Sequence, residues 1–404
     1  MADSALFRLI LFDLNPTGHH PGYLQHLIVY ARERAGRVAL DVVVSADFPE
    51  RHPDIVALAQ VPGVTLLPIT ASEQRQVTEG SFLKRMQAEW RLCCAYARKR
   101  RADQILLMYV DQFQLALLTG PKAPCPVAGI YFRPTFHYPR FATYRAGSWK
   151  ERLRETRKQV LLRLALWRSD FGTLFCLDPF SVDAIRPWHP ATVHLPDPVE
   201  IYPHTPDEQS RVRARLAVEP GRKAALIFGL LDERKGILPL VQALGYLTEA
   251  EQRQLALVLV GPMPEYVRTE LDPLLTEAAG RYPVQLVRYH DFVPDDQIQP
   301  YFAAADFVLA LYQQHVGMSA VLVRSAAAGR PVLSSDYGLM GELVTRRGLG
   351  LTTDAANPTA IAEALRRMLT GGTGVARAAV MTEFAEQNRA ARYAQTIFDT
   401  LIPH

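Results

Sequence analysis

Three short glycine-containing segments hold residue types that bind phosphate. The first is Gly18-His19-His20-Pro21-Gly22, in which each histidine can donate a hydrogen bond to a phosphate or a hydroxyl. The second runs from Gly229 to Gly236 and carries Arg234 and Lys235, two cations that can clamp a diphosphate. The third runs from His315 to Arg324. Free backbone N–H groups at the start of a helix suit an anion, so each segment predicts a phosphate contact.

The third segment predicts a helix start that holds the phosphate directly. Ser319 is a typical N-cap, and Gly317 opens the turn before it. We therefore expect the run Gly317-Met318-Ser319-Ala320-Val321 to cradle the ligand through its N–H groups. Arg324 lies five residues into the helix, where it can face the same ligand.

Each segment also has an ordinary structural interpretation. The first can be a turn with surface histidines, the second a solvated charged turn, and the third a buried helix with one surface arginine. These alternatives stay open at this point.

Two further candidates follow apolar runs in the first half. Asp111 follows Ile105–Val110, and its carboxylate can orient or deprotonate an acceptor hydroxyl. Aspartate is equally suited to capping a helix, so that alternative stands beside the catalytic one. Arg133 follows Val127–Phe132 and can bind a phosphate or the acceptor.

Short apolar runs alternate with helical patterns along the whole chain, which predicts parallel sheets covered by helices on both faces. The polar, proline-rich stretch 196–210 reads as a linker. We predict an α/β protein with two doubly wound Rossmann-like domains, 1–198 and 199–381. A final helix, Thr382–Leu401, lies in the remainder, 382–404.

The composition excludes several classes of protein. Of the 404 residues, 49% are hydrophobic and 21% charged, which is typical of a soluble globular chain. The four cysteines form no disulfide framework or zinc motif, and no stretch is long and apolar enough to span a membrane. The start does not read as a signal peptide, so we expect a cytoplasmic protein.

Missing motifs narrow the chemistry further. No G-x-G-x-x-G follows a strand, and no P-loop motif is present, so neither a standard dinucleotide site nor a P-loop NTPase is expected. No two aspartates are separated by a single residue, which disfavours a metal–diphosphate site. We therefore expect neither a metal nor a cofactor.

The second half resembles the donor-binding domain of GT-B glycosyltransferases. The resemblance is to the retaining clan that includes glycogen synthase, sucrose synthase and bacterial mannosyltransferases. It covers about residues 222–370, and the first half is similar through Gly18–Gly22 and His194–Val199. The matching runs are Gly229…Lys235-Gly236, Leu257–Gly261, Val287–Pro294, Tyr301–Asp306, Ala327–Val332, Ser335–Gly338 and Gly341–Val344.

The resemblance implies a nucleoside diphosphate sugar donor, a hydroxyl acceptor and transfer without a metal. Lys235 would neutralise the leaving diphosphate, with Arg234 beside it. The segment His290–Val293 would border the nucleobase, and residues 382–404 would pack back on the first domain. The expected donor-binding residues are Gly18, His19, Gly229, Gly261, Phe292, His315, Gly317, Met318, Ser319, Ala320, Val321 and Arg324. His20 and Arg133 are expected to bind the acceptor.

The chain departs from the family pattern at four places. Leu230 stands where an arginine is usual, and Arg234 is our candidate for the missing charge. The family's pair of glutamates falls on Val316 and Arg324, and His315 is our candidate for the contacts that are lost. The histidine common in the family's first domain falls on Phe132 or Arg133.

The basic excess lies mainly in the first half, where residues 1–200 carry 25 Lys and Arg against 19 Asp and Glu. The helix Trp149–Arg168 has cations on one face and apolar residues near the other, namely Trp149, Leu153, Val160, Leu161, Leu164 and Trp167. We favour a helix packed on the sheet with a solvated basic face. The alternative is peripheral contact with an anionic membrane, to which the resemblance lends support. Nucleic-acid binding is not expected.

Together these observations predict a glycosyltransferase that acts on a glycan, glycolipid or secondary metabolite, with retention implied by the resemblance. Two alternatives remain. One is a nucleotide-sugar epimerase or hydrolase. The other is a non-catalytic relative that binds a nucleotide sugar or a partner glycosyltransferase, and the loss of both glutamates favours it.

Overall fold

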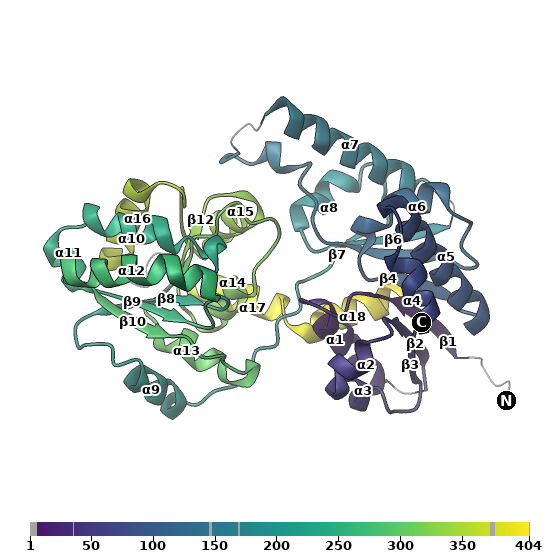
Figure 1. Ribbon diagram of the computed structural model, residues 1–404, viewed down its shortest axis with the longest axis horizontal. Helices are drawn as coiled ribbons and strands as arrows, with labels where there is room; N and C mark the ends of the chain where they lie inside the picture. Colours follow the sequence, from purple (N-terminus) through teal and green to yellow (C-terminus); the bar gives the residue numbers. More distant parts are fainter. Residues whose placement is uncertain (1–5, 35, 145–147, 169, 372–375, 404) are drawn as a thin grey trace. The chain divides into compact units, whose positions relative to one another are not determined.

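The computed structural model describes all residues except 1–5, 35, 145–147, 169, 372–375 and 404. The described residues form two compact units. One consists of the ranges 1–137, 146–198 and 390–404, and the other of 138–145 and 199–389. Each unit is built around its own parallel sheet (Figure 1). The predicted class, α/β with two doubly wound Rossmann-like units, is confirmed.

The first unit has a seven-stranded sheet in the order β3-β2-β1-β4-β5-β6-β7. Every neighbouring pair of these strands is parallel. The strands are β1 (Phe7–Phe12), β2 (Val38–Val44), β3 (Val64–Pro68), β4 (Gln104–Leu107), β5 (Val127–Tyr131), β6 (Phe171–Cys176) and β7 (Thr192–His194). Its helices are α1 (His20–Arg32), α2 (Phe48–Arg51), α3 (Pro53–Leu58), α4 (Ala71–Thr78), α5 (Phe82–Arg100), η1 (Val110–Gln112), α6 (Gln114–Thr119), α7 (Trp149–Leu166), α8 (Pro179–Ile185) and α18 (Ala390–Leu401).

Helices cover both faces of this sheet, because its strands are apolar on both sides. On one face, strand residues such as Leu9 and Leu11 pack with α1, α3 and α18. On the other face, Ile10 and Phe12 pack with α5, α6, α7 and α8. The last helix of the chain therefore belongs to the core of the first unit.

The second unit has a six-stranded parallel sheet in the order β10-β9-β8-β11-β12-β13. The strands are β8 (Lys223–Phe228), β9 (Leu255–Val260), β10 (Gln285–Tyr289), β11 (Phe307–Ala310), β12 (Val332–Ser335) and β13 (Gly350–Thr353). The helices are η2 (Tyr138–Arg140), α9 (Pro206–Arg215), η3 (Glu233–Lys235), α10 (Ile237–Ala243), η4 (Leu244–Tyr246), α11 (Glu249–Arg253), α12 (Glu265–Arg281), η5 (Asp295–Gln297), α13 (Gln299–Ala304), α14 (Ala320–Ala327), α15 (Gly338–Arg347), α16 (Pro358–Gly371) and α17 (Ala378–Gln387).

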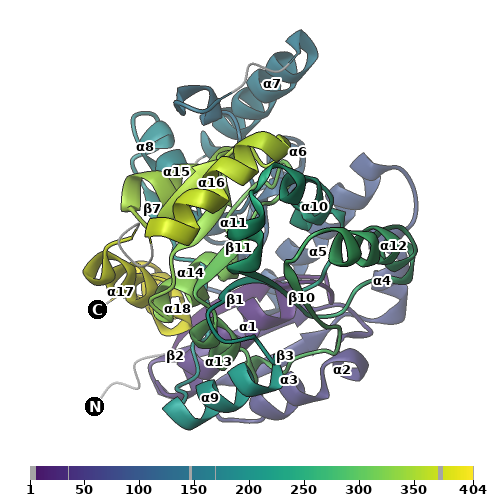
Figure 2. The same ribbon diagram turned by 90° about the vertical axis from the view of Figure 1, so that its left-hand side faces the viewer.

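One face of the second sheet packs against α10, α12 and α16 in a single apolar core. Helix α16 lies beside α10 (Figure 2).

Several helices begin at a reciprocal cap, in which a Thr or Ser side chain and a Glu three residues later satisfy each other's backbone N–H groups. These caps are Thr70 with Glu73, Ser148 with Glu151, Thr205 with Glu208, and Thr248 with Glu251.

The single helix predicted over Thr382–Leu401 is wrong. The structure has two helices there, α17 and α18, separated at Asn388 and Arg389. Asn388 ends α17 by donating from Nδ2 to the carbonyl oxygen of Phe384 at 2.8 Å. Its own carbonyl oxygen accepts from the N–H of Val199 at 3.1 Å. A contact with a distant part of the chain therefore fixes the break.

Helix α7 packs in the core of the first unit, as the favoured interpretation expects, but through other apolar residues than the sequence suggested. It packs through Leu162, Ala165 and Leu166, whereas most of the apolar residues expected to cover the sheet are exposed. Trp149 is 70% exposed and Trp167 87%. The exposed set is Trp149, Leu153, Val160, Leu164 and Trp167. None of the helices in the described ranges has the length and apolar character needed to cross a membrane.

Candidate functional site

The loops after β8 and β9 meet so closely that only glycine fits between them. Gly261 has φ +124°, and a Cβ atom there would lie 2.3 Å from the carbonyl oxygen of Gly229. Gly229 itself has φ +100° and lies beside the ammonium group of Lys235. Gly236 is equally tight, because its Cβ would lie 2.2 Å from the carbonyl oxygen of Leu311. These close contacts hold the carboxyl ends of β8, β9 and β11 against one another next to Lys235.

Substituting Gly261 by alanine should therefore destabilise the second unit. We expect a loss of about 2 kcal/mol or more in the free energy of unfolding, because both the φ angle and the contact oppose a Cβ. Gly280→Ala is the matched control, since no heavy atom lies within 4 Å of its Cβ position in α12. Chemical denaturation of both variants checks this. Equal stability of the two would contradict the packing described.

Lys235 lies at the centre of this arrangement. It ends the short helix η3 and is buried. Its Nζ donates to the carbonyl oxygen of Phe228 at 2.6 Å and to Oη of Tyr312 at 2.7 Å. An ammonium group has three N–H donors, so one remains for a ligand. The solvated charged turn, the alternative interpretation of this segment, does not describe Lys235.

A chain of hydrogen bonds joins Lys235 to the start of α14. Oη of Tyr312 lies 3.1 Å from Oγ of Ser319, and either hydroxyl can donate. Ser319 is the N-cap of α14, and its Oγ accepts from the N–H of Val321 at 3.3 Å. The structure therefore brings two of the predicted phosphate-binding features together. The N–H of Val321 donates to this cap, so it is not free to bind the phosphate as the sequence analysis predicted.

Arg234 is less free than predicted. Its Nε and Nη2 both donate to Oδ2 of Asp232, at 2.9 and 2.6 Å. This pair raises the pKa of Arg234 and shares its charge with the carboxylate. The guanidinium group is nevertheless well exposed, so it can still contact an anion. We expect it to contribute less positive potential than Lys235.

The loop before α14 holds the remaining donor candidates of that segment. Gly317 has φ +98°, with open space where its side chain would be. The ring of His315 lies against that of Tyr312, with centroids 5.1 Å apart and planes tilted by 41°, and its Nε2 lies 3.2 Å from the carbonyl oxygen of Met318. His315 therefore contacts both the turn Gly317–Ser319 and Tyr312, and helps to hold them in place.

Arg324 occupies different surroundings from Lys235. Its side chain is buried, and burial lowers its pKa, while the charges of Asp295 and Glu200 oppose that effect. Its carbonyl oxygen accepts from Nε2 of Gln299 in α13 at 3.0 Å. The interpretation of Arg324 as one surface arginine is wrong. Phe292, by contrast, is 75% exposed in the loop after β10.

The first segment, Gly18–Gly22, lies in the first unit and contains a buried pair. Nδ1 of His20 lies 2.7 Å from Oδ2 of Asp13, and both side chains are buried. An ionised carboxylate only accepts hydrogen bonds, so Nδ1 carries the hydrogen and Nε2 can face a ligand. His19 stacks on His20, with ring centroids 4.7 Å apart. The alternative of two surface histidines is therefore wrong for His20.

Aromatic rings surround His19. Phe132, Tyr109 and Tyr23 lie 5.1, 6.4 and 5.2 Å from it between ring centroids. Burial, with smaller effects from His20 and Arg133, lowers the pKa of His19 to about 4. His19 is thus neutral at pH 7 and acts as a hydrogen-bonding group rather than as a cation.

Asp111 is not a helix cap of the predicted kind. It lies within η1, and its carboxylate accepts from the N–H groups of Phe132 and Arg133 at 2.9 and 3.0 Å. It thereby fixes the loop that follows β5. Burial raises the pKa of Asp111 to about 6, although the two N–H donors oppose this rise. A carboxyl group with such a pKa suits general acid–base work near neutral pH.

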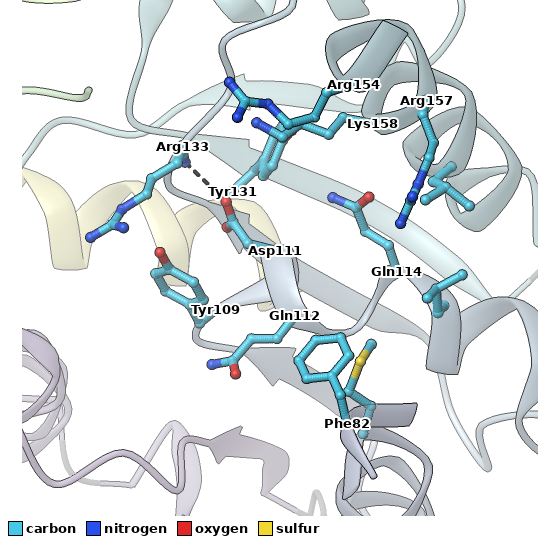
Figure 3. Close-up of a pocket in the computed structure, with 13 residues that line it drawn as sticks. Phe82, Tyr109, Asp111, Gln112, Gln114, Tyr131, Arg133, Arg154, Arg157 and Lys158 are labelled. Atoms are coloured by element: carbon cyan, nitrogen blue, oxygen red, sulfur yellow. Dashed lines mark hydrogen bonds between the residues drawn. The ribbon is translucent and has the colours of Figure 1, made fainter. Parts of the chain in front are cut away.

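Two adjoining cavities open at Asp111, both lined by residues of the first unit, and Figure 3 shows the one that extends toward α7. One of about 510 Å³ extends toward α7, and one of about 520 Å³ extends toward Gly18, His19 and His20. The residues that line both are Phe82, Tyr109, Asp111, Gln112 and Arg133. Five predicted residues of the first unit therefore share one cavity: Gly18, His19, His20, Asp111 and Arg133.

Sequence reasoning missed Tyr312 and Asp13. Tyr312 follows an apolar strand and belongs to no motif, so nothing in the sequence marks it as the partner of Lys235. Asp13 interrupts the apolar run of β1, and a carboxylate just past a buried strand is a usable signal. Within the described ranges no three His, Cys, Asp or Glu side chains gather as metal ligands.

The described geometry places glycine loops, a buried lysine and a capped helix start at one edge of the second sheet. Residues 222–371, which include all of these, match the family model "Glycosyl transferases group 1". This part of the chain is therefore similar to the glycosyl transferases group 1 family. The predicted resemblance is thereby confirmed.

Two curated relatives match over part of their length. An uncharacterized glycosyltransferase of Methanocaldococcus jannaschii is 26% identical over 163 residues, 40% of this chain and 40% of that protein. The D-inositol 3-phosphate glycosyltransferase of Corynebacterium urealyticum is 28% identical over 192 residues, 47% of this chain and 44% of that protein. The chain thus spans less than half the length of these relatives.

Solved structures resemble the whole chain in fold. Anabaena Alr3699/HepE, solved in complex with UDP and glucose, has a TM-score of 0.63 and 18% identity. The match covers 98% of this chain and 99% of that protein. The chain therefore has the GT-B fold, and the residues that match the family model lie in the second unit.

Proposed function

We propose that the protein is a glycosyltransferase that moves a sugar from a nucleoside diphosphate sugar to a hydroxyl acceptor, without a metal and with retention. The hydrogen-bonded chain Lys235–Tyr312–Ser319 carries this proposal. It places a buried ammonium group and a helix start together, as a leaving diphosphate requires. The donor's diphosphate binds there, on the second unit.

Lys235 acts on the leaving group. Negative charge grows on the diphosphate as the glycosidic bond breaks, and the third N–H of Lys235 stabilises that charge. Its other two hydrogen bonds hold the ammonium group in place, so little reorganisation is needed. Arg234 and the turn at Gly317 complete the contact.

The acceptor binds on the first unit, in the cavities around Asp111. The carboxylate of Asp111 accepts the hydrogen of the acceptor hydroxyl, while His20 and Arg133 position the acceptor. His20 is well suited to this because Asp13 fixes its ring.

A panel of nucleoside mono- and diphosphates and nucleotide sugars tests the donor site. A ligand that binds only the folded state at about 100 times its Kd adds about 2.7 kcal/mol of stability, which raises Tm by several degrees. UDP and UDP-glucose come first, since Anabaena Alr3699/HepE was solved with both. We expect a rise in Tm for one base. No rise for any nucleotide at millimolar concentration would contradict the proposal.

A non-catalytic role is the second candidate. This role is favoured because Val316 and Arg324 stand where the family's two glutamates are expected. The guanidinium group of Arg324 has no hydrogen-bond acceptor, so it cannot replace the carboxylate of a glutamate. A non-catalytic protein would show the rise in Tm but leave the nucleotide sugar intact. An epimerase or hydrolase would consume the donor with no acceptor present.

A further inference from the structure

The cavity beside α7 has an uneven distribution of charge. It is lined by Phe82, Met86, Tyr109, Asp111, Gln112, Gln114, Leu115, Tyr131, Arg133, Arg154, Arg157, Lys158 and Leu161. Four of these residues are cations and one is a carboxyl group. Such an excess in a concave site concentrates anions.

Three of the cations come from one helix. Arg154, Arg157 and Lys158 are spaced three and four residues apart on α7, so they share one face of it. Figure 3 shows their side chains coming from this helix on one side of Asp111. Lys158 donates to Glu155 at 2.9 Å and Arg154 lies 3.5 Å from the same carboxylate. Even with Glu155 included, cations exceed carboxyl groups by two.

Of these three cations on α7, Arg157 has the fewest side-chain contacts. In the part of the chain that the structure describes, no ion pair or side-chain hydrogen bond engages it. An exposed arginine beside two other cations is repelled by them unless an anion is bound. The opposite wall offers Asp111, which suits a hydroxyl group rather than an anion.

We infer that the acceptor carries an anionic group, a phosphate or a carboxylate, which Arg154, Arg157 and Lys158 hold while the reacting hydroxyl lies at Asp111. This rests on the proposed transferase function. A phosphate offers three oxygens, enough for the guanidinium groups and the ammonium group together. The three residues thus determine acceptor specificity, and Asp111 serves the reaction.

Paired probes that differ only in a phosphate test this inference. Isothermal titration measures binding of glucose 6-phosphate and of glucose to the full chain without donor. We expect glucose 6-phosphate to bind and glucose not to bind. The affinity for glucose 6-phosphate should fall about tenfold or more in Arg157→Gln, because the variant loses a charge-assisted hydrogen bond. In transfer assays the same variant should raise KM for a phosphorylated acceptor far more than it lowers kcat.

Arg152→Gln is the matched control, because Arg152 lies on the same helix and does not line the cavity. Its binding and KM should equal those of the wild type. Equal effects of the two variants, or equal use of neutral and phosphorylated probes, would overturn the inference. The rise in Tm with nucleotides should be unchanged in both variants. Its absence from the wild type would mean instead that the proposed function has failed.

The anion can belong to a free metabolite or to a lipid headgroup. Flotation with vesicles of phosphatidylcholine and phosphatidylglycerol separates these sources. Vesicle binding that is lost in Arg157→Gln and kept in Arg152→Gln would support the inference with a lipid-borne anion. Binding lost equally in both variants, with no binding of glucose 6-phosphate, would show general attraction to the surface of α7 and overturn it.

Discussion

Replacing Lys235 by alanine should lower kcat/KM for the nucleotide sugar by roughly 10²–10³-fold, as loss of one preorganised donor to a developing charge does elsewhere. The change removes the third N–H of the ammonium group from the leaving diphosphate. It should also abolish most of the rise in Tm with nucleoside diphosphates and spare that with nucleosides. Steady-state kinetics with coupled detection of the released diphosphate measures the first effect.

Lys235→Ala also affects the fold, so it needs a control. It leaves the carbonyl oxygen of Phe228 without its donor, which costs roughly 1–3 kcal/mol in the free energy of unfolding. Lys235→Met keeps most of the length of the side chain, so it removes the ammonium group and its hydrogen bonds without the cavity that alanine leaves. If Lys235→Met retained wild-type kcat/KM, the role assigned to the charge would be wrong. Arg234→Gln should cost less than either, because Asp232 already shares its charge.

Asp111→Asn should lower the transfer rate by roughly 10²–10⁴-fold, the range for loss of a positioned general base. In the wild type, the pKa of Asp111 is raised to about 6 by burial. The carboxylate must be ionised to accept a proton, so kcat/KM should rise with pH through about 6 and become flat above. The variant should lack this rise. A wild-type profile that is flat from pH 5 to 8 would contradict this role.

The same shift changes stability with pH. The folded-state pKa of Asp111 is above its ordinary value of 3.8, so the carboxyl group favours the folded state when protonated. This contribution is complete below pH 4 and is lost as pH rises through about 6. The difference in unfolding free energy between wild type and Asp111→Asn should therefore change by about 2 kcal/mol over that window. Comparing the wild type with Asp111→Asn isolates the effect of Asp111. This is needed because burial also raises the pKa of Glu89, to about 7.

The sequence was informative where local pattern decides structure. Runs such as Leu255–Val260 are short, rich in branched residues and apolar on both faces, which is typical of a central parallel strand, so the two sheets were predictable. The turn at Gly317 and the N-cap Ser319 were predictable for the same reason, because their chemistry is local. Lys235 was found through its position after a strand.

Features set by distant contacts were not predictable. The break at Asn388 depends on Val199, far away in the sequence. The face that α7 buries depends on which of its apolar residues meet the sheet, and the helical period allowed more than one choice. Tyr312 gained its importance only when folding brought it to Lys235 and Ser319. The pKa of Asp111 likewise depends on burial that a single sequence does not display.

The most direct test of the proposal follows the sugar itself. The full chain is incubated with the nucleotide sugar that raises its Tm, with and without hydroxyl acceptors, and the products are identified and quantified by mass spectrometry. The proposal predicts one glycosylated acceptor for each nucleoside diphosphate released, with both products formed roughly 10²–10³-fold more slowly by Lys235→Met. Nucleoside diphosphate released at the same rate without an acceptor, or a donor that stays intact with every acceptor, would contradict it.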